Sequence, residues 1–391
     1  MTEYNVAYYV NNNIQHFPPV NQLQATLPGL ILVRGEKVLD LINTRYPGYS
    51  DRTYLVRHAY QGQRLLRKHR IRLVIYPAFQ NLNRGLAVEI FHGGLSDKRY
   101  LENVRIARYD LVLFPGKKSR DKVENANLLD KVIKWKIIGY PKFDPLRNNT
   151  LQYTPVFDNG NPTILYAPTW ISITKPGATT HRHSQHGESS LPLWGLNLLK
   201  NIPSNINLIV KFHCLVHEGG DTIHNEMEQY VKDNNLGHRI RFLYDDNILQ
   251  YMAQSEIMIS DISSACYEWF HFDRPIIFAN PAPDHYEVAD DISANTYAWQ
   301  TGDVINKVED ISRLIEKNLN ADEYREKRNE IFNYSLYKPD GNATQRQADA
   351  IKELYDEYRH IPYWWFSIKM VFKHFGRVIY VKLIVKRALK K

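Results

Sequence analysis

Short apolar runs alternate along the first 150 residues with longer segments of helical periodicity. The run Leu-Ala-Val-Glu-Ile-Phe at 86–91 has the length of a buried strand, whereas 36–44 and 59–69 repeat apolar residues every three to four positions. Strands are predicted at 5–10, 29–33, 72–76, 86–91, 111–114 and 136–138. Such alternation of strands with helices indicates parallel βαβ units.

A second alternating series follows a linker-like segment at 144–162 that is rich in Asn, Pro and Thr. Its strands are predicted at 163–167, 207–212, 239–244, 256–259 and 275–278, and its helices at 192–201, 221–235, 246–254, 263–272 and 306–333. A further amphipathic helix at 340–359 is expected to return to the first domain.

These patterns predict an α/β protein with two Rossmann-like domains that face a central cleft. The expected divisions are a first domain at 1–150, a second at 151–336, a return helix at 337–360 and a tail at 361–391. A length of 391 residues favours two cores over one.

Cysteine content and charge narrow the class of protein. The only cysteines, Cys214 and Cys266, stand in unrelated contexts, which excludes a disulfide framework and a cysteine-based zinc site. Three histidines at 181, 183 and 186 are predicted to lie in a polar surface loop rather than to bind a metal, because no carboxylate or cysteine accompanies them. No metal and no cofactor are expected.

The formal charge of +8 resides in the tail, since 361–391 holds eight Lys and Arg and no acidic residue. The remainder has 42 basic and 42 acidic side chains, so the body is not predicted to bind nucleic acid. No apolar run is long enough to span a bilayer as a helix, and the first residues do not resemble a secretory leader.

The first candidate for chemistry is His92, which follows a predicted strand and precedes Gly93 and Gly94. Ligands of parallel sheets bind beyond the carboxyl ends of the strands. Histidine suits proton transfer near neutral pH, and the two glycines permit positive φ and the close approach of a ligand. A plain turn at His92 is the alternative. The nearby Ser96–Arg99 stretch reads either as a solvated helix start or, through Lys98 or Arg99, as an anion contact.

The strongest local signal is the Ser-Asp-Ile-Ser-Ser run that follows the predicted strand at 256–259. Its polar members Ser260, Asp261, Ser263 and Ser264 precede a helix, where hydroxyls and unpaired N–H groups bind phosphate. Capping of that helix by Asp261 or Ser263 is compatible with the same role.

Two further strand ends carry polar residues. Thr169 and Trp170 follow Pro168 at the end of the first strand of the second domain, and Lys211 and His213 end the next. By strand alternation Lys211 and His213 share one face, where both can meet a diphosphate. A structural role for His213 is the alternative.

In this order the motifs resemble those of the CDP-glycerol glycerophosphotransferase family of teichoic-acid-type polymerases and primases. They are Phe-His-Gly at 91–93, Gly-Tyr-Pro-Lys-Phe-Asp at 139–144, Tyr-Ala-Pro-Thr-Trp at 166–170, Lys-Phe-His at 211–213, Ser-Asp-Ile-Ser-Ser at 260–264 and Arg-Pro-Ile-Ile-Phe at 274–278. The chain departs from the family between His92 and Lys98, and Cys214 replaces a proline, so the transferred group stays open.

The resemblance implies a glycosyltransferase-B-like fold in which the second domain holds a cytidine-nucleotide donor. His92 would be the general base for an acceptor hydroxyl. His213 and Asp261 would complete the catalytic set, and Gly93, Gly94, Thr169, Lys211, Ser260, Ser263 and Ser264 would bind the donor. Electrostatic stabilisation of the diphosphate would then replace a metal.

The expected reaction moves glycerol phosphate, or a related group, to a hydroxyl of a lipid-linked or growing cell-surface polymer. A glycosyltransferase that uses a CMP- or UDP-activated sugar such as Kdo, in capsule or lipopolysaccharide synthesis, is the alternative enzyme. An inactive scaffold of the polymer-assembly machinery is the alternative from another class.

The tail at 361–391 is predicted to attach the protein to the anionic cytoplasmic face of the membrane as a peripheral element. Its apolar and aromatic residues recur at helical spacing, and Lys369, Lys373 and Arg377 recur every four residues on another face. The alternative is a C-terminal helix that packs on the first domain.

Overall fold

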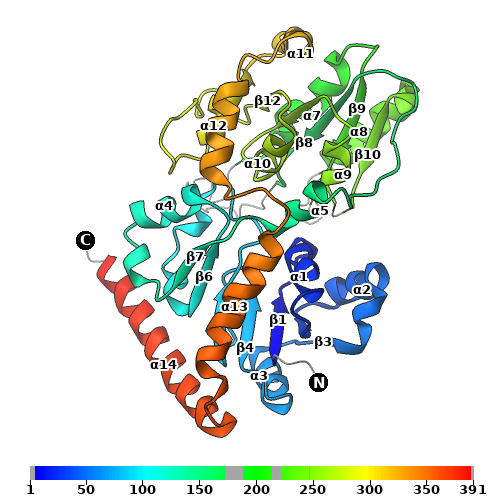
Figure 1. The fold of residues 1–391 in the computed structure, drawn as a ribbon. Coiled ribbons are helices and arrows are strands. Elements are labelled where there is room, and N and C mark those ends of the chain that lie inside the picture. The colour runs from blue at the N-terminus through cyan, green and yellow to red at the C-terminus, as the bar shows by residue number, and fades with distance from the viewer. Residues whose placement is uncertain (1–4, 172–187, 214–215, 217–221, 246, 389–391) are drawn as a thin grey trace. The chain divides into compact units, whose positions relative to one another are not determined.

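A computed structural model describes residues 5–171, 188–213, 216, 222–245 and 247–388 of the chain. The fold consists of two compact units, each built on one parallel sheet (Figure 1).

The division of the chain between the units is not a simple one. The first unit comprises Met1–Gly94, Leu101–Thr150 and Leu336–Lys391, and the second comprises Leu95–Tyr100 and Leu151–Ser335. Leu95–Tyr100, which follows the His-Gly-Gly turn, therefore belongs to the second unit, a crossing that the expected divisions at 150 and 336 do not contain. Both C-terminal helices belong to the first unit.

The first unit contains a seven-stranded parallel sheet of order β3-β2-β1-β4-β5-β6-β7. Its strands are β1 (Val6–Val10), β2 (Leu30–Val33), β3 (Thr53–Leu55), β4 (Leu73–Tyr76), β5 (Leu86–Glu89), β6 (Leu111–Phe114) and β7 (Trp135–Ile137). The central strands are buried on both faces, which explains their continuous apolar runs. The strand order reverses between β1 and β4, the point at which such sheets bind ligands.

The helices of the first unit include three that the periodicity did not predict, α1, α4 and α5. The full set is α1 (Phe17–Gln24), α2 (Glu36–Arg45), α3 (Ala59–Lys68), α4 (Lys117–Asn125), α5 (Asp144–Arg147), α13 (Ala343–Arg359) and α14 (Tyr363–Ala388). Helix α13 lies within the segment where a return helix was expected. Its first amides, at Ala343 and Thr344, donate to the Asp144 carboxylate at 3.1 and 2.7 Å, which anchors the helix to the first unit.

The second unit contains a six-stranded parallel sheet of order β10-β9-β8-β11-β12-β13. Its strands are β8 (Thr163–Ala167), β9 (Asn207–Lys211), β10 (Ile240–Leu243), β11 (Ile257–Ser260), β12 (Ile276–Ala279) and β13 (Asp303–Ile305). Its helices are α7 (Leu191–Asn201), α8 (Ile223–Asp233), α9 (Leu249–Met252), α10 (Ala265–Trp269), α11 (Asp310–Asn320) and α12 (Arg325–Ser335). The reversal of strand order falls between β8 and β11.

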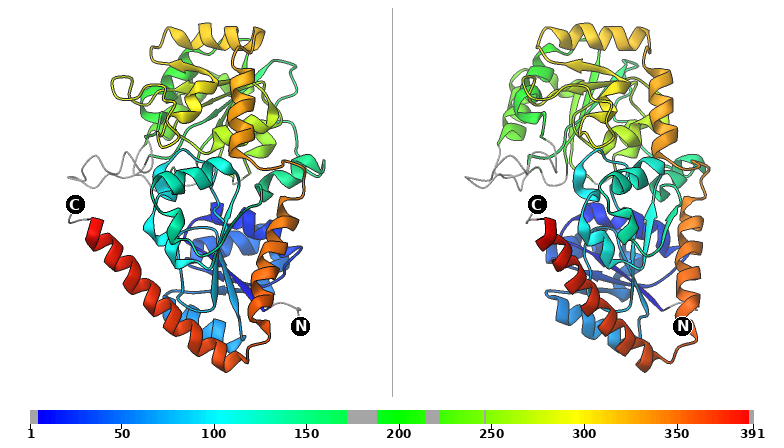
Figure 2. Two further views of the ribbon diagram at one scale, coloured as in Figure 1. Left: turned by 60° about the vertical axis from the view of Figure 1, so that its left-hand side comes forward. Right: turned by 90° about the vertical axis from the view of Figure 1, so that its left-hand side faces the viewer.

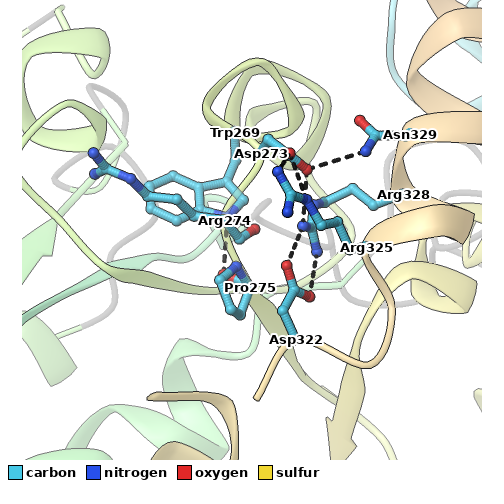
Figure 3. A network of polar contacts seen from close by, with 8 residues as sticks. All are labelled: Trp269, Asp273, Arg274, Pro275, Asp322, Arg325, Arg328 and Asn329. Atoms are coloured by element: carbon cyan, nitrogen blue, oxygen red, sulfur yellow. Dashed lines mark hydrogen bonds and ion pairs between the residues drawn. The ribbon is translucent and has the colours of Figure 1, made fainter. Parts of the chain in front are cut away.

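The single helix predicted at 306–333 is wrong. The chain forms α11, leaves helical geometry at Ala321, where φ is −149°, and begins α12 at Arg325. The fully buried Arg328 of α12 donates to Asp322 in the connection and, at 3.1 Å, to Asp273 (Figure 3). These ion pairs fix the break between the two helices.

The Arg-Pro-Ile-Ile-Phe motif has a structural role in the same region. The Trp269 indole donates to the carbonyls of Arg274 and Pro275, both at 2.9 Å (Figure 3). The Arg274 guanidinium donates to the Ser255 carbonyl just before β11. The motif thus ties α10 and the start of β12 to the end of α9.

The tail forms one long helix, α14, which follows α13 after a sharp turn (Figure 2). It packs on the first unit through Phe366, Met370, His374 and Arg377, all buried. Lys373 and Arg377 both donate to the buried Asp110. The expectation that these two cations form a basic face toward lipid is therefore wrong. Both side chains instead pair with the buried carboxylate of Asp110, which directly precedes β6.

The aromatic and aliphatic side of α14 is exposed instead. Trp364, Phe372 and Phe375 are 66%, 72% and 67% exposed. Other exposed members are Trp365, Ile368, Val371, Ile379, Tyr380, Leu383 and Val385. Among the described residues, no helix has the length and apolar character needed to cross a membrane.

Candidate functional site

His92 lies at the carboxyl end of β5, in the first unit. The 3₁₀ turn Ile14–His16 follows β1, and Pro77 follows β4 directly, so residues from three adjacent strand ends meet at the reversal of strand order. His92 is half-buried. Its position agrees with the ligand-binding edge expected for such a sheet.

The orientation and the tautomer of His92 are fixed by the backbone. The amide of His92 and its ring Nδ1 both lie 2.8 Å from the Pro77 carbonyl oxygen. Because a carbonyl only accepts, Nδ1 carries the hydrogen and Nε2 carries the lone pair. Burial lowers the pKa of His92, with the Pro77 bond opposing and Lys142 adding to the effect. A neutral imidazole with a basic Nε2 can accept a proton from a hydroxyl.

His16 is a site residue that the sequence patterns did not indicate. Its ring contacts that of His92, with centroids 4.2 Å apart and planes inclined by 57°. Burial, followed by repulsion from His92, holds the pKa of His16 well below its usual value. The sequence feature that could have indicated His16 is its position shortly after the apolar run of β1. No other motif residue stands beside it in the sequence.

The glycines after His92 permit positive φ at positions 93 and 94, but the structure has it one residue before His92. Within the described residues, positive φ at this turn occurs at Phe91 (48°) and not at Gly93 or Gly94. A Cβ on Gly94 would lie 3.0 Å from the Pro115 ring and 3.1 Å from the Phe91 Cβ. Close packing within the protein therefore explains the glycine at position 94. The predicted contact of Gly94 with the nucleotide donor stays a prediction.

The Gly-Tyr-Pro-Lys-Phe-Asp motif supports this turn from the other side. The Tyr140 hydroxyl donates to the His92 carbonyl at 2.6 Å. Gly139 adopts φ of 92° beside Tyr337 and Arg346, and Asp144 holds the start of α13. The motif therefore links the return helix to the backbone of His92.

In the second unit, Asp261 follows β11 and is 1% exposed. Its carboxylate accepts from the Thr169 amide at 2.9 and 3.0 Å, and from the amide and hydroxyl of Ser190 at 2.8 and 2.9 Å. Burial raises the pKa of Asp261 to about 6, while these donors and Lys98 oppose the rise. Of the two residues considered as caps of α10, Asp261 instead holds the end of β8 and the start of α7.

The Ser96–Arg99 stretch is not a solvated helix start, because Ser96 and Asp97 are buried in the second unit. Asp97 accepts from the Tyr267 hydroxyl and from the Ala298 amide. Lys98 donates to the Thr169 hydroxyl at 2.8 Å. Burial lowers the pKa of Lys98 to about 8, with Asp261 opposing the effect. This places a partly buried cation at the carboxyl end of β8.

The serines that follow β11 divide into two kinds. Ser260 is fully buried, and its hydroxyl donates to the Ala167 carbonyl at 2.8 Å, which places it between β11 and β8 rather than toward a ligand. Ser263 and Ser264 are half-buried. The Ser263 hydroxyl accepts from the Ala265 amide at 3.3 Å as α10 begins. Only these last two keep hydroxyls at the strand end.

Lys211 and His213 lie at the end of β9 but differ in surroundings. Lys211 is buried, and its ammonium donates to the Phe212 carbonyl at 2.6 Å. His213 is half-buried and stacks near Trp170, with centroids 6.2 Å apart and planes inclined by 24°. His213, Trp170 and Asp261 thus follow β9, β8 and β11, the strands around the reversal of order.

The predicted histidine loop at 181–186, Cys214, His217 and Glu218 lie outside the described residues. In the part of the chain that is described, no group of three or more His, Cys, Asp or Glu side chains is placed to hold a metal ion.

Both units are thus parallel α/β sheets with polar side chains at the strand ends where the order reverses, as expected for a glycosyltransferase-B-like fold. The chain belongs to the CDP-Glycerol:Poly(glycerophosphate) glycerophosphotransferase family, whose family model matches residues 81–353. No curated protein matches the sequence.

Solved structures agree on the fold. The wall teichoic acid polymerase TagF is 16% identical with a TM-score of 0.59, over 91% of this chain and 90% of that one. The same polymerase soaked with CDPG for 30 minutes gives a TM-score of 0.58 at equal identity and coverage. The S. aureus MnaA-UDP co-structure is 12% identical with a TM-score of 0.57, over 92% and 99% of the two chains.

Proposed function

We propose that this protein transfers glycerol phosphate from CDP-glycerol to a hydroxyl group of a lipid-linked or growing cell-surface polymer. The observation that carries the proposal is the family match across residues 81–353, which includes His92, Lys98, Thr169 and Asp261. The neutral His92, with its lone pair on Nε2, is suited to the proton transfer that the reaction requires.

The proposed step is a substitution at phosphorus. The acceptor oxygen forms a bond to the β-phosphorus of the donor, the P–O bond to CMP breaks, and CMP leaves with the electron pair. His92 Nε2 takes the proton of the acceptor hydroxyl. No other co-reactant is needed.

The second unit supplies the donor-binding groups in this proposal. Lys98 and His213 would stabilise the charge that develops on the diphosphate, and Ser263 and Ser264 would donate hydrogen bonds. Asp261, which is buried beneath Thr169, would act by positioning Thr169 and Lys98 rather than by touching the substrate.

Donor profiling tests the proposal. The protein is incubated with an acceptor membrane fraction and with CDP-glycerol, CDP-ribitol, CMP-Kdo or UDP-sugars, and nucleotide release is measured. We expect CMP from CDP-glycerol, and its loss in His92→Ala but not in the exposed control His360→Ala. Turnover only with a CMP- or UDP-sugar would identify a glycosyltransferase instead, and no turnover with any donor would favour the scaffold.

The exposed side of α14 supports a second element of the proposal, attachment to the cytoplasmic face of the membrane. Aromatic and aliphatic side chains cover this side from Trp364 to Val385, and Lys382 is exposed beside them. Aromatic residues on an exposed helix stripe favour the interfacial region of a bilayer. A lipid-linked acceptor would explain why this surface stays uncovered.

A vesicle assay tests attachment without removing the helix. Trp364, Phe372 and Phe375 are replaced together by serine, and sedimentation with vesicles of phosphatidylglycerol and phosphatidylcholine is compared with that of wild type. Tyr60→Ser with Leu193→Ser, at exposed positions outside α14, is the matched control. Undiminished binding by the triple variant would contradict the role of α14.

A further inference from the structure

The last residue of β5, Glu89, is a carboxyl group three positions before His92 whose environment is unusual. Its side chain is 0% exposed. Oε1 accepts a hydrogen bond from the Phe91 amide at 3.2 Å, and Oε2 has no hydrogen-bond partner within the described residues. No Lys, Arg or His side chain of the described chain forms an ion pair with it.

These surroundings favour the uncharged acid. A buried carboxylate without a cation is so costly that the group binds a proton instead. Among the described residues, the phenols of Tyr76 and Tyr109 interact with it, and Arg108, which lies near these phenols, donates to Asn83 at 2.6 Å. Burial holds the pKa of Glu89 well above its usual value, although the Phe91 amide and Tyr109 act in the opposite direction.

The bond from Phe91 to Glu89 stabilises a strained turn. Phe91 has φ of 48°, a left-handed conformation that is unfavourable for a residue with a side chain. Its ring is fixed by Phe79 and Phe114, with centroids 5.4 and 6.0 Å away. This turn ends β5 and directs both the amide and the ring of His92 to the Pro77 carbonyl.

The Pro77 carbonyl is itself held by the same neighbourhood. The Tyr109 hydroxyl donates to the Gln80 carbonyl at 2.6 Å and so fixes the loop that follows Pro77. The backbone amide of Leu82, in the same loop, donates to the Tyr76 hydroxyl at 3.0 Å. Glu89, Tyr76 and Tyr109 therefore hold the backbone of the turn at Phe91 and of the loop after Pro77.

We propose that Glu89 is a positioning residue that, as an uncharged acid, holds the left-handed turn at Phe91 and thereby the orientation and tautomer of His92. This inference rests on the proposed function of His92 as the general base. It assigns to Glu89 no contact with substrate.

Two substitutions separate this role from others. Glu89→Gln keeps an acceptor for the Phe91 amide without any charge, whereas Glu89→Leu keeps the volume but removes the acceptor. We expect Glu89→Gln to retain kcat within about three-fold. Glu89→Leu should lose about 10- to 100-fold in kcat, the range expected for a misplaced catalytic group, with little change in the KM for the donor. Glu102→Gln, at a buried glutamate paired with Lys122, is the matched control and should leave the His92 signals unchanged.

A readout independent of turnover is the nitrogen NMR spectrum of the histidines, in which His92 is identified by its loss in His92→Gln. We expect an Nδ1–H tautomer in wild type and Glu89→Gln, and a mixture of tautomers in Glu89→Leu. If His92→Ala is fully active, the general-base assignment fails, while the spectra still test Glu89. Wild-type spectra and kcat in Glu89→Leu would overturn the inference, as would an equal loss in Glu89→Gln.

A stability measurement keeps the inference testable if Glu89→Leu does not fold. Because the pKa of Glu89 is raised in the folded state, its contribution to stability is present below its unfolded pKa and is lost as pH rises toward the folded pKa. Urea unfolding at pH 6 and pH 9 should therefore show a smaller alkaline loss for Glu89→Gln than for wild type. Equal losses would show that Glu89 is charged and would overturn the proposal.

Discussion

Glu89 and Asp261 are both carboxyl groups with almost no exposure, and both stand at the carboxyl end of a central strand. Asp261 accepts from two backbone amides and a hydroxyl and lies near Lys98. Glu89 accepts from the Phe91 amide, and its Oε2 has no hydrogen-bond partner among the residues that the structure describes. Burial raises the pKa of both carboxyl groups, to about 6 for Asp261 and well above its usual value for Glu89. The larger set of hydrogen-bond donors around Asp261 opposes this rise and favours its charged form.

We expect the two carboxyl groups to support different roles. A charged Asp261 supports the Lys98 ammonium, and a cation at that strand end suits a diphosphate. Burial lowers the pKa of His92, which favours the neutral imidazole. Under the proposed function, the second unit would bind the anionic donor and His92 would take the proton.

The largest expected effect is at the two histidines that follow β5 and β9. His92→Ala and His213→Ala should each lower turnover by about 10²-fold or more, as the loss of a general base or an electrostatic donor does. Initial rates of CMP release measure the effect, with thermal unfolding to show that folding is kept. Near wild-type rates in His92→Ala would remove it from the mechanism.

Replacement of the charged acid should cost stability. In Asp261→Asn one oxygen becomes an NH₂ group that faces the donors of Ser190, so we expect a loss of roughly 1–3 kcal/mol in the free energy of unfolding. Urea unfolding at pH 7.5 measures it, with the exposed Asp130→Asn as control. An unchanged midpoint would mean that the Asp261 bonds contribute nothing net.

The pH dependence of CDP-glycerol binding tests the proposed role of Asp261 in supporting the Lys98 ammonium. Because the pKa of Lys98 is about 8, its ammonium is present below that pH, and the KM for CDP-glycerol should rise about ten-fold for each pH unit above it. Asp261→Asn removes the group that raises the pKa of Lys98, so the rise should begin at lower pH. A KM that stays flat to pH 9.5 would exclude Lys98 from donor binding.

The smallest expected effect is the alkaline stability of the uncharged acid. Glu89→Gln should differ little from wild type near pH 6 and should be the more stable of the two at pH 9, because wild type must either keep a proton or bury a charge. A difference of the opposite sign would indicate that Glu89 is ionised and paired in solution.

The sequence by itself determined the two sheets and the family. Continuous apolar runs such as those of β4, β8 and β11 arise because parallel strands are buried on both faces, so a local pattern reports the global fold. It did not predict the short edge strands β3 and β13, although it did predict β7, which is equally short. A run of three residues carries little periodicity, so such strands are easily missed. The motifs placed His92, Thr169 and His213 at strand ends, where the structure has them.

Only the tertiary structure decided what the polar residues at those ends contact. Asp261 is bonded to residues 92 and 71 positions away, and His16 reaches His92 from another strand, so no local spacing could indicate either partner. The tail shows the same limit. Its periodicity determined a helix with an apolar and a basic side, but the buried Asp110 determined that Lys373 and Arg377 turn inward and the aromatic side outward. A buried charge is strongly destabilising unless an opposite charge pairs with it, and the partner can come from any part of the fold. The local sequence therefore does not show which residue the partner is.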